Sequence, residues 1–434
     1  MIAMTLAEIS SVVGGRVDGD PTHTVTGAAY VDSRHPEPGG LFVAVVGEHS
    51  DGHDFAAHAH AVLGSRPTGR PTVVVDDPVV ALAALARHVV RQVRPRVLAV
   101  TGSQGKTGAK DLLAAVLTGS VATRGNLNNE LGVPLTCLRL APDSTHLVLE
   151  MGARGVGHLA WLCDIARPDV AAVTAVGTAH VGEFGSPELI ALAKGELVEA
   201  LAPDGVAVLN ADDAAVLAMA SRTGGSVLTY GARAAVSWRE MTLDERGRAS
   251  FTLCHAGRSE RVRLQVVGRH QVANATAAAA MALAVDVPLA LVAARLSSAA
   301  PASPHRCDLR ERADGLLVLD DTYNANPASV RAALDTLVAL SSPRAGRPVA
   351  VLGEMRELGA ASHAAHLAVG EHARSLGVGV LAVGAAASAY GGVPVADLPA
   401  ALAWLQADLR PDDTVLLKAS RGVGLDRLVA DLLA

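Results

Sequence analysis

Lysine is rare in this chain, and two of its positions lie in segments typical of catalytic centres. Only four lysines occur among 434 residues, at positions 106, 110, 194 and 418. Lysine and arginine together number 37, so arginine supplies nearly all the other cationic side chains. A lysine amine can be neutralised and can react, whereas a guanidinium group is planar and permanently charged. The scarcity therefore indicates that Lys106 and Lys194 serve a nucleotide-dependent centre.

A glycine-rich loop surrounds the first of these lysines. It joins the β-branched run 96–100 to a helical pattern that begins near Lys106. Glycines let backbone N–H groups approach phosphates, the helix N-terminus favours negative charge, and the lysine adds a cation. The hydroxyl of Thr107 is suited to hold Mg²⁺. We predict a nucleotide-phosphate loop made of Gly102, Ser103, Gln104, Gly105, Lys106, Thr107 and Gly108.

Two further polar residues follow predicted strands of the same region. Glu150 ends the apolar run 146–149, and His180 comes shortly after the run 173–176. Ligands of open α/β sheets bind beyond the carboxyl ends of strands, so both residues are placed near a nucleotide's metal. A carboxylate suits Mg²⁺, whereas histidine is a less usual partner for so hard an ion. On spacing alone, a helix-capping acid and an ordinary loop histidine are equally consistent interpretations.

Lys194 lies on the apolar face of a predicted helix. Residues 186–188 form a helix start, with a capping hydroxyl, a proline in the first turn and an early acid. Lys194 shares one face with Ile190 and Leu197, whereas Glu196 falls on the opposite side. Burial would lower the pKa of the lysine amine and make it reactive. The alternative is a lysine whose stem covers the core edge while its amine reaches water.

Other polar clusters are consistent with turns or with sites. Asn126-Leu-Asn-Asn-Glu130 and Asp320-Asp-Thr-Tyr-Asn-Ala-Asn-Pro327 consist of ordinary turn residues. Asp51-Gly-His-Asp-Phe55, with His58 and His60, has the look of a metal cluster. No partner cysteine or carboxylate spacing supports that interpretation. We therefore expect these histidines to lie on the surface.

The elements that must position these residues form three regions. Strand and helix patterns alternate after residue 94, which favours βαβ units and parallel sheets, and the segment 300–304 marks a linker. We predict an α/β fold with a small α/β N-terminal domain (1–93), a central P-loop-type ATPase domain on a parallel sheet (94–300) and a C-terminal Rossmann-like domain (301–434). Expected strands are 41–46, 72–75, 96–100, 146–149, 170–173, 316–319, 348–352, 378–383 and 414–417, with helices over 327–340 and 362–376.

Composition excludes several classes of protein. The net charge of −6 argues against a nucleic-acid partner, which would need a basic face. The four cysteines are far apart, so neither a disulfide framework nor a zinc ribbon is supported and a reducing cytoplasm is expected. Residues 1–8 lack the pattern of a signal peptide. The apolar tract 275–294 is interrupted by Asp286 and Pro288, which favours core helices over a membrane span.

Taken together and in their order, the motifs resemble those of the Mur ligases. They are Thr101-Gly-Ser-Gln-Gly-Lys-Thr107, Glu150-Met-Gly-Ala153, His180, Ala193-Lys-Gly-Glu196, Gly268-Arg-His-Gln-Val-Ala-Asn274 and Asp320-Asp-Thr-Tyr-Asn-Ala-Asn-Pro327. The segments that resemble the member adding D-alanyl-D-alanine are Asn126-Leu-Asn-Asn-Glu-Leu-Gly-Val-Pro134, Tyr323-Asn-Ala-Asn-Pro327 and Gly353-Glu-Met-Arg-Glu-Leu358. The resemblance extends into the first region through Asp32-Ser-Arg34.

The resemblance implies a cytoplasmic, monomeric, ATP- and Mg²⁺-dependent amide ligase of peptidoglycan precursor synthesis, with two metal ions. The C-terminal carboxylate of UDP-N-acetylmuramoyl-tripeptide would form an acyl phosphate, which the amine of D-alanyl-D-alanine then attacks. Implied catalytic residues are Lys106, Lys194 and His180. Implied metal ligands are Thr107, Glu150, His180 and Lys194, the last as an N-carboxylysine. Further implied ATP contacts are His270, Asn274, Arg306, Asp321, Asn324 and Asn326; implied substrate contacts are Ser33, Arg34, Asn128 and Asn129.

Some positions differ from the family pattern and leave alternatives open. Gly108 stands where Ser or Thr is usual, Gln104 where a small residue or Asn is common, and Ala175 where Asn is frequent. A hydroxyl lost at position 108 would weaken the phosphate contact. The alternatives are a Mur-type paralogue with another amine acceptor and a nucleotide-binding regulator without turnover. Lys418 ends a predicted strand of the third region, a position that can face the cleft, but it has no assigned role. Lys110 is expected to be a solvated helix residue.

Overall fold

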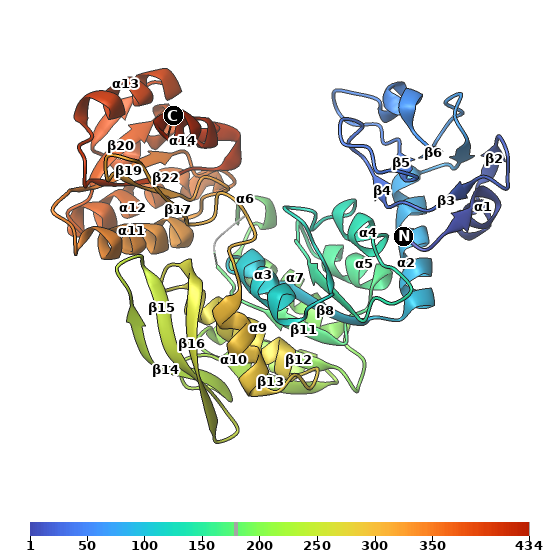
Figure 1. Ribbon diagram of the computed structural model, residues 1–434, viewed down its shortest axis with the longest axis horizontal. Coiled ribbons are helices and arrows are strands. Elements are labelled where there is room, and N and C mark those ends of the chain that lie inside the picture. The colour runs from blue at the N-terminus through green and yellow to red at the C-terminus, as the bar shows by residue number, and fades with distance from the viewer. Residues whose placement is uncertain (178–180, 434) are drawn as a thin grey trace.

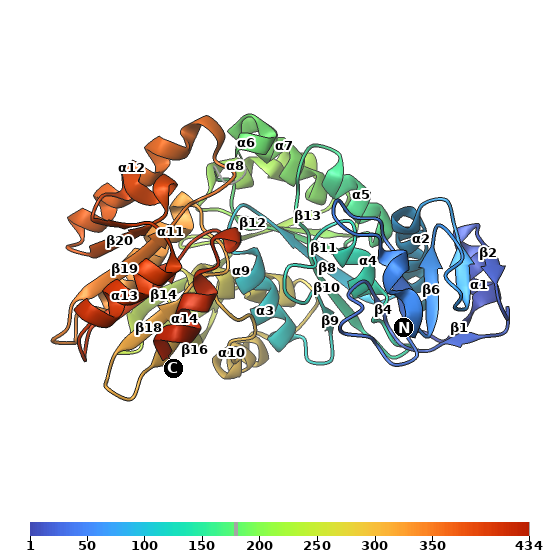
Figure 2. The same ribbon diagram turned by 90° about the horizontal axis from the view of Figure 1, so that it is seen from above.

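Helices and largely parallel strands form three successive parts of the chain (Figure 1). The computed structural model describes residues 1–177 and 181–433. The middle part lies between the other two parts in both views (Figures 1 and 2). The predicted α/β class and the division into three domains are therefore confirmed. The domain boundaries near residues 93 and 300 stay predictions.

The N-terminal part is built on a small mixed sheet. Its elements are β1 (Met4–Thr5), α1 (Leu6–Val13), β2 (Arg16–Asp18), β3 (Thr24–Val25), β4 (Ala29–Tyr30), β5 (Leu41–Val43), β6 (Ala61–Gly64), β7 (Thr72–Val74) and α2 (Pro78–Val93). The sheet order is β2-β7-β6-β5-β4, with only the β2–β7 pair antiparallel. Strands β1 and β3 form a separate antiparallel pair.

The middle part contains the largest sheet. Its elements are β8 (Arg96–Thr101), α3 (Lys106–Val116), β9 (Val121–Ala122), α4 (Gly132–Cys137), β10 (His146–Glu150), α5 (His158–Ile165), β11 (Val170–Val173), α6 (Val181–Phe184), α7 (Pro187–Glu199), β12 (Val206–Asn210), α8 (Ala214–Leu217), β13 (Ser226–Tyr230), β14 (Val236–Leu243), β15 (Arg248–His255), β16 (Arg258–Val267), α9 (Gln271–Leu283) and α10 (Leu289–Ser298). The strand order is β16-β15-β14-β13-β12-β11-β8-β10-β9.

Strand β8 lies at the centre of the site because its two neighbours run parallel to it. Glu150 at the end of β10 is level with Val100, and Val173 at the end of β11 is level with Thr101. The carboxyl ends of the three strands therefore open onto the same edge of the sheet. Loops that follow these strands are brought together there, as expected for an open α/β sheet.

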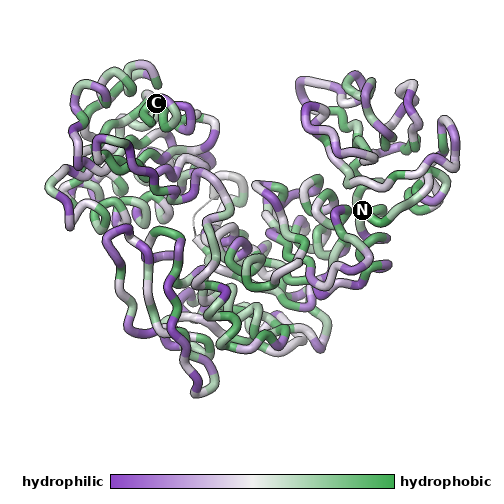
Figure 3. Tube along the Cα trace, in the orientation of Figure 1, coloured by the Kyte–Doolittle hydropathy of each residue, from purple (hydrophilic) through white to green (hydrophobic). Residues whose placement is uncertain are grey.

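The far side of this sheet departs from the predicted parallel arrangement. Strands β14, β15 and β16 are antiparallel to one another, and Figure 3 shows many hydrophilic residues along them. Their half-exposed faces alternate polar and apolar residues, unlike the buried β8. An antiparallel sheet can face water on one side, which accounts for the difference.

The C-terminal part is a second doubly wound sheet. Its elements are β17 (Asp308–Glu311), β18 (Leu317–Asp320), α11 (Pro327–Ser341), β19 (Pro348–Gly353), α12 (Ser362–Ser375), β20 (Gly379–Val383), β21 (Val393–Val395), α13 (Leu398–Asp408), β22 (Thr414–Lys418) and α14 (Leu425–Leu433). The order is β17-β18-β22-β19-β20-β21, with only the β17–β18 pair antiparallel. Short 3-10 helices cover Gly52–His58 in the N-terminal part, Ala218–Arg222 in the middle part, and Gly359–Ala361, Ala385–Tyr390 and Arg421–Val423 in the C-terminal part.

Glycines permit close contacts between the middle and C-terminal parts. A Cβ at Gly247, in the turn between β14 and β15, would lie 3.1 Å from Leu340 of α11. A Cβ at Gly182 of α6 would lie 2.9 Å from the backbone nitrogen of Gly359. The Gly182 N–H also donates to the Glu357 carbonyl at 3.3 Å. These contacts bring the two parts together through backbone as well as side chains.

The apolar tract 275–294 forms core helices, as predicted. It runs through α9 and α10, and residues 275–282 are fully buried. Across residues 1–177 and 181–433, none of the helices combines the length and the apolar character that crossing a bilayer requires.

Helix α2 ties the N-terminal part to the middle part. It begins with Asp77, whose carboxylate accepts two backbone N–H groups, followed by Pro78 in the first turn. It packs against α1 and β6 as well as against α4 and α5. Its buried side chains belong to one continuous apolar cluster that includes residues of both parts. The two parts therefore share a core.

Replacing Leu85 by alanine should lower the free energy of unfolding by about 2–5 kcal/mol, because a fully buried leucine of the shared core leaves a cavity. Urea unfolding followed by circular dichroism measures this change. Val80→Ala is the control on the same helix, since Val80 is 59% exposed and should change stability by about 0.5 kcal/mol or less. Equal effects of the two substitutions would contradict a core that runs through α2.

Candidate active site

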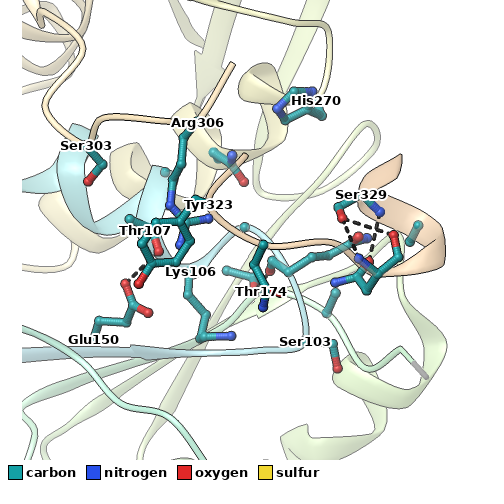
Figure 4. A pocket seen from close by; sticks show the side chains of 18 of the residues that line it. Ser103, Lys106, Thr107, Glu150, Thr174, His270, Ser303, Arg306, Tyr323 and Ser329 are labelled. Atoms are coloured by element: carbon teal, nitrogen blue, oxygen red, sulfur yellow. Dashed lines mark hydrogen bonds between the residues drawn. The ribbon is translucent and has the colours of Figure 1, made fainter. Parts of the chain in front are cut away.

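A cavity of about 600 Å³ lies between the middle and C-terminal parts (Figure 4). Residues of both parts line it, and residues 1–93 contribute none of its lining. The predicted site residues on its wall are Ser103, Gln104, Gly105, Lys106, Thr107, Gly108, Asn128, Asn129, Glu150, Lys194, His270, Asn274, Arg306, Asp321, Asn324 and Asn326. Its volume is within the usual range for a small-molecule site.

The predicted phosphate loop connects β8 to α3 in the conformation that its glycines require. Gly102 has φ +149°, and a Cβ there would lie 1.9 Å from the Thr174 hydroxyl. Gly105 has φ +81° and caps the start of α3. Both positions combine a backbone conformation that favours glycine with a crowded neighbour. The loop therefore presents its backbone to the cavity as the sequence predicts.

A segment after β11 fastens this loop from the side. The Thr174 hydroxyl donates to the Gln104 carbonyl at 2.5 Å, and the Ser103 N–H donates to the Ala175 carbonyl at 2.8 Å. The Ser103 hydroxyl accepts the Gly177 N–H at 2.9 Å. These side-chain and backbone bonds hold the loop rigid, which is how a phosphate site is organised before its ligand arrives.

Lys106 is half-buried at the start of α3, without a carboxylate partner in direct contact. Its amine donates to the Gly102 carbonyl at 2.5 Å, within its own loop. Burial lowers the pKa of Lys106, the charge of Arg306 lowers it further, and Glu150 acts in the opposite direction. A phosphate group bound here would supply the missing negative charge.

Thr107 and Glu150 meet at the carboxyl end of the sheet, as predicted for a metal site. The Thr107 hydroxyl donates to Glu150 Oε2 at 2.8 Å (Figure 4), and the Asn128 amide donates to Oε1 at 2.7 Å. Glu150 is only 2% exposed. Oxygen donors of this kind suit Mg²⁺. Asn128, predicted as a substrate contact, thus lies beside the candidate metal ligand.

Lys194 is buried on α7 and reaches the cavity. The helix starts as predicted, with the Ser186 hydroxyl accepting the Leu189 N–H. The Lys194 side chain is 3% exposed, and its amine has no hydrogen-bond partner among residues 1–177 and 181–433. Burial, followed by the charge of Lys106, lowers the pKa of Lys194 to about 7. Of the two interpretations open from the sequence, the buried amine is the one observed.

The expected placement of Glu196 on the outer side of α7 is wrong. Its carboxylate is buried and accepts the N–H groups of Gly157 at 2.5 Å and Ala160 at 3.0 Å, at the start of α5. Helix α7 packs against α5 as well as against the sheet, so it has more than one buried face. Glu196 compensates the unpaired N–H groups of a neighbouring helix.

Gly108 faces helix α9 at close range. A Cβ at position 108 would lie 2.6 Å from the Asn274 amide nitrogen and 3.0 Å from the Gln271 side-chain oxygen. Asn274 also lies over Gly105, and its amide donates to Gln271 at 2.8 Å. The space that a Ser or Thr would take is thus filled by α9 side chains. Asn274 is held against the phosphate loop.

His270 precedes α9 and faces the C-terminal part across the cavity. Its Nδ1 is buried and has no hydrogen-bond partner in the described chain. Burial lowers the pKa of His270, with the charges of Asp321 and Lys418 acting in opposite directions. The imidazole is therefore neutral near pH 7 and retains one unused polar atom for a ligand.

The C-terminal part contributes Arg306 and the loop after β18. The Arg306 guanidinium lies over the Tyr323 ring, 4.0 Å from its centre (Figure 4), and no carboxylate pairs with it among the described residues. Asp321 is 9% exposed. Asn326 caps α11, accepting the Ser329 N–H at 2.8 Å, and the Asn324 side chain accepts the Ala325 N–H at 2.9 Å. The turn-forming roles of both asparagines are therefore observed.

Several predicted residues lie elsewhere or play structural roles. Ser33 and Arg34 are in the N-terminal part, where Arg34 pairs with Asp32, and they do not line the cavity. Gly102 supports the loop without lining the cavity. The Asn129 side chain accepts the Gly132 N–H at 2.9 Å at the start of α4. His180 lies outside the described residues.

Two expectations of solvent exposure are wrong. Lys110 is 3% exposed and pairs with Asp111, because α3 is covered by α9 and α10. His53 is buried rather than on the surface, with Nδ1 2.5 Å from Asp51 and Nε2 accepting the Ser65 N–H at 2.9 Å. Among the side chains that the structure describes, no group of three His, Cys, Asp or Glu residues is placed to hold a metal.

Sequence reasoning missed some residues of the cavity wall. These include Thr174, Ser303, Tyr323, Ser329 and Arg356. Lys418, which the sequence placed at the end of a strand without assigning it a role, lines the cavity from the end of β22. The position of Thr174 directly after β11 was a usable signal, because it follows the strand-end rule. The other residues depend on how the two parts pack, which no local pattern indicates.

Comparison with known proteins identifies relatives along the whole chain. Residues 100–282 match the Mur ligase middle domain, and residues 305–421 match the domain described as Mur ligase, glutamate ligase domain. The chain is 42% identical to the UDP-N-acetylmuramoyl-tripeptide--D-alanyl-D-alanine ligase of Mycobacterium bovis, covering 99% of this chain and 98% of the relative. The crystal structure of MurF from Acinetobacter baumannii matches with a TM-score of 0.90 at 32% identity, covering 99% of each chain. MurF ligase from Thermotoga maritima in complex with ADP matches with a TM-score of 0.81 at 30% identity, covering 94% of this chain and 97% of that one.

Gly108→Ser should weaken nucleotide binding by about threefold to tenfold, because the new side chain displaces the Asn274 amide and costs about one hydrogen bond. Titration calorimetry with ADP measures the change. Gly224→Ser is the matched control, since a Cβ there meets open space. Tighter nucleotide binding by Gly108→Ser would show instead that the absent hydroxyl limits the site.

Proposed function

Because the chain belongs to the Mur ligase family, we propose that it joins D-alanyl-D-alanine to the C-terminal carboxylate of UDP-N-acetylmuramoyl-tripeptide, with cleavage of ATP to ADP and phosphate. The observation that carries this proposal is the shared cavity. It combines the phosphate loop, the Thr107–Glu150 pair and buried Lys194 of the middle part with Arg306 of the C-terminal part. The proposed reaction is a step in the synthesis of the peptidoglycan precursor. We propose that the chain carries it out in the cytoplasm, as a monomer.

The proposed reaction proceeds in two displacements. A carboxylate oxygen of the tripeptide attacks the γ-phosphorus of ATP, and the bond from phosphorus to the ADP oxygen breaks. The amine of D-alanyl-D-alanine then attacks the acyl carbon and loses a proton. The carbon–oxygen bond to phosphate breaks, which leaves an amide and inorganic phosphate. Both steps bring together groups that are negatively charged or that develop negative charge.

Cations of the cavity suit the first step, in which a carboxylate must approach a triphosphate. Lys106 belongs to the phosphate loop, and Arg306 acts electrostatically on Lys106 across the cavity. Both cations lack a carboxylate in direct contact among the described residues. They are therefore free to compensate phosphate charge in the transition state, where such fixed charges contribute most. His270 and Asn274 are the proposed contacts on the nucleotide base side, with Asp321 toward the ribose.

The donor set of Thr107 and Glu150 fits Mg²⁺. The buried carboxylate and the hydroxyl converge to 2.8 Å, and both supply oxygen. We propose that these residues hold the first metal ion. When bound, Mg²⁺ would neutralise phosphate charge and orient the phosphoryl group.

The Lys194 amine by itself does not fit a metal site, since a cation or a nitrogen donor is unsuited to Mg²⁺. Reaction of the neutral amine with CO₂ forms an N–C bond, releases a proton and creates a carboxylate on the side chain. The buried position and the pKa near 7 keep part of the amine neutral at physiological pH. We propose N-carboxylysine at position 194 as a ligand of a second ion, with His180 as its partner ligand.

The proposed substrate is long enough to extend beyond the cavity. Its UDP end would contact the N-terminal part, with Ser33 and Arg34 as candidates, while the tripeptide carboxylate reaches the phosphate loop. Asn128 and Asn129 lie on the cavity wall and are the proposed contacts of the tripeptide. An acyl phosphate is readily hydrolysed, so a site enclosed by two domains protects it from water.

Phosphate release should require all three substrates together: UDP-N-acetylmuramoyl-tripeptide, D-alanyl-D-alanine and ATP with Mg²⁺. A coupled phosphate assay measures the rate, and mass spectrometry identifies the pentapeptide product. The assay uses tripeptides ending in diaminopimelate and in lysine. Phosphate release at the background rate with both tripeptides would refute the proposed reaction. Turnover with another amine would indicate a different acceptor.

Lys194→Ala should abolish ligation while the protein stays folded, because the second metal site loses a ligand. Added short carboxylates such as acetate or formate should restore part of the rate by occupying the vacated space. Leu192→Ala on the exposed side of the same helix is the control and should ligate normally. Full activity of Lys194→Ala would refute the proposed carboxylated lysine.

A further inference from the structure

Lys418 is a buried cation at the carboxyl end of β22. It is 2% exposed, and its amine donates to Asp321 Oδ2 at 2.5 Å and to the Asn324 carbonyl at 2.8 Å. The Asp321 carbonyl lies 3.4 Å from the same amine. An ammonium group has three hydrogens, and three acceptors surround this one. The loop after β18 therefore folds around the Lys418 charge.

The same aspartate fastens the linker between the middle and C-terminal parts, which in the structure is the segment 299–307 between α10 and β17. While Oδ2 accepts from Lys418, Asp321 Oδ1 accepts the Cys307 N–H at 3.2 Å. Cys307 has φ +50°, a conformation that a residue with a side chain adopts only when its surroundings enforce it. Its neighbour Arg306 lies over Tyr323 of the same loop. Two further hydrogen bonds join the linker to the loop after β18. The His305 ring pairs with the Asp320 carboxylate, and the Tyr323 N–H donates to the His305 carbonyl.

We propose that Lys418 is a positioning residue for the nucleotide, and this inference rests on the function proposed above. Its charge fixes the Asp321 carboxylate, and through Cys307 it fixes the backbone that carries Arg306. The two proposed nucleotide contacts of the C-terminal part thus depend on one ammonium group. A guanidinium cannot replace it, because the group is larger and planar while the three acceptors enclose a compact charge.

A purely structural role makes a different prediction. Replacing both members of a buried ion pair by neutral groups is often tolerated, whereas removing one member leaves an uncompensated charge. If Lys418 only stabilises the fold, Lys418→Met should lower the unfolding temperature and leave the ADP affinity of the folded protein unchanged. If Lys418 acts through Asp321, Lys418→Met should weaken ADP binding, and adding it to Asp321→Asn should restore stability without weakening ADP binding further.

The test measures ADP binding by calorimetry, and thermal unfolding, for Lys418→Met, Asp321→Asn and the double variant. Lys418→Met should weaken ADP binding by about tenfold or more, as loss of a supporting residue commonly does. The double variant should bind ADP no more weakly than whichever single variant has the lower ADP affinity, since the two substitutions act through one contact. Its unfolding temperature should be higher than that of Lys418→Met. The KM for ATP should rise, while the KM for D-alanyl-D-alanine stays unchanged.

Arg347→Met is the matched control, because it removes an ion pair at the opposite end of β22 from Lys418. Arg347 directly precedes β19 and pairs with the buried Asp413, which directly precedes β22, and neither residue lines the cavity. This substitution should lower the unfolding temperature without changing ADP affinity. Three results would overturn the inference. Lys418→Met could bind ADP as tightly as the unaltered protein, the losses of ADP affinity could add up in the double variant, or Arg347→Met could lose as much ADP affinity as Lys418→Met. ADP binding needs no turnover, so a protein that binds ADP but fails to ligate would refute the proposed reaction and leave this test intact.

Discussion

Positive charge that no carboxylate contacts is the constraint on which the site depends. Lys194 is buried and Lys106 is half-buried, and burial together with repulsion by Lys106 lowers the pKa of Lys194. Glu150 opposes this effect at Lys106 but already accepts hydrogen bonds from Thr107 and Asn128. Such an arrangement is costly in an empty protein and favourable around a polyanion. The rigid loop, the parallel strand ends and the helix starts all hold these charges where a triphosphate would compensate them.

The fold and the phosphate loop follow closely from local sequence patterns. The run before Gly102, the glycines and the helical face after Lys106 agree on one strand, loop and helix, and Ser186 correctly marks the start of α7. Two of the errors share a cause. Lys110 and Glu196 are buried by helices distant in sequence, whereas helical periodicity assumes a single buried face. The error at His53 differs, because a histidine that binds no metal can still be buried when Asp51 and Ser65 bond its ring. The strands β14–β16 were not predicted, although their sequences alternate polar and apolar residues as half-exposed antiparallel strands do. Roles in the site depend on packing between domains, which lies beyond any local pattern.

The C-terminal part completes the site through contacts that differ in kind. Near α11, Gly247 and Val267 pack against an apolar surface that includes Leu340. Across the cavity, Gly182 and Gly359 meet backbone to backbone. Between them the linker is bonded to the loop after β18 rather than hanging free. A rotation of the C-terminal part would therefore carry Arg306 and Asp321 as one unit, keeping their geometry while changing their distance from the phosphate loop.

Helix α2 also bears on how the chain can be divided. Its apolar stripe is shared between the N-terminal sheet and helices α4 and α5, so a cut after residue 93 exposes part of that stripe on the fragment and leaves a matching groove on the remainder. Exposed apolar patches of this kind promote self-association. The three parts of the chain are therefore not equally separable. The C-terminal part is joined by a linker and glycine contacts, whereas the first two parts behave as a single piece for truncation, domain exchange or insertion.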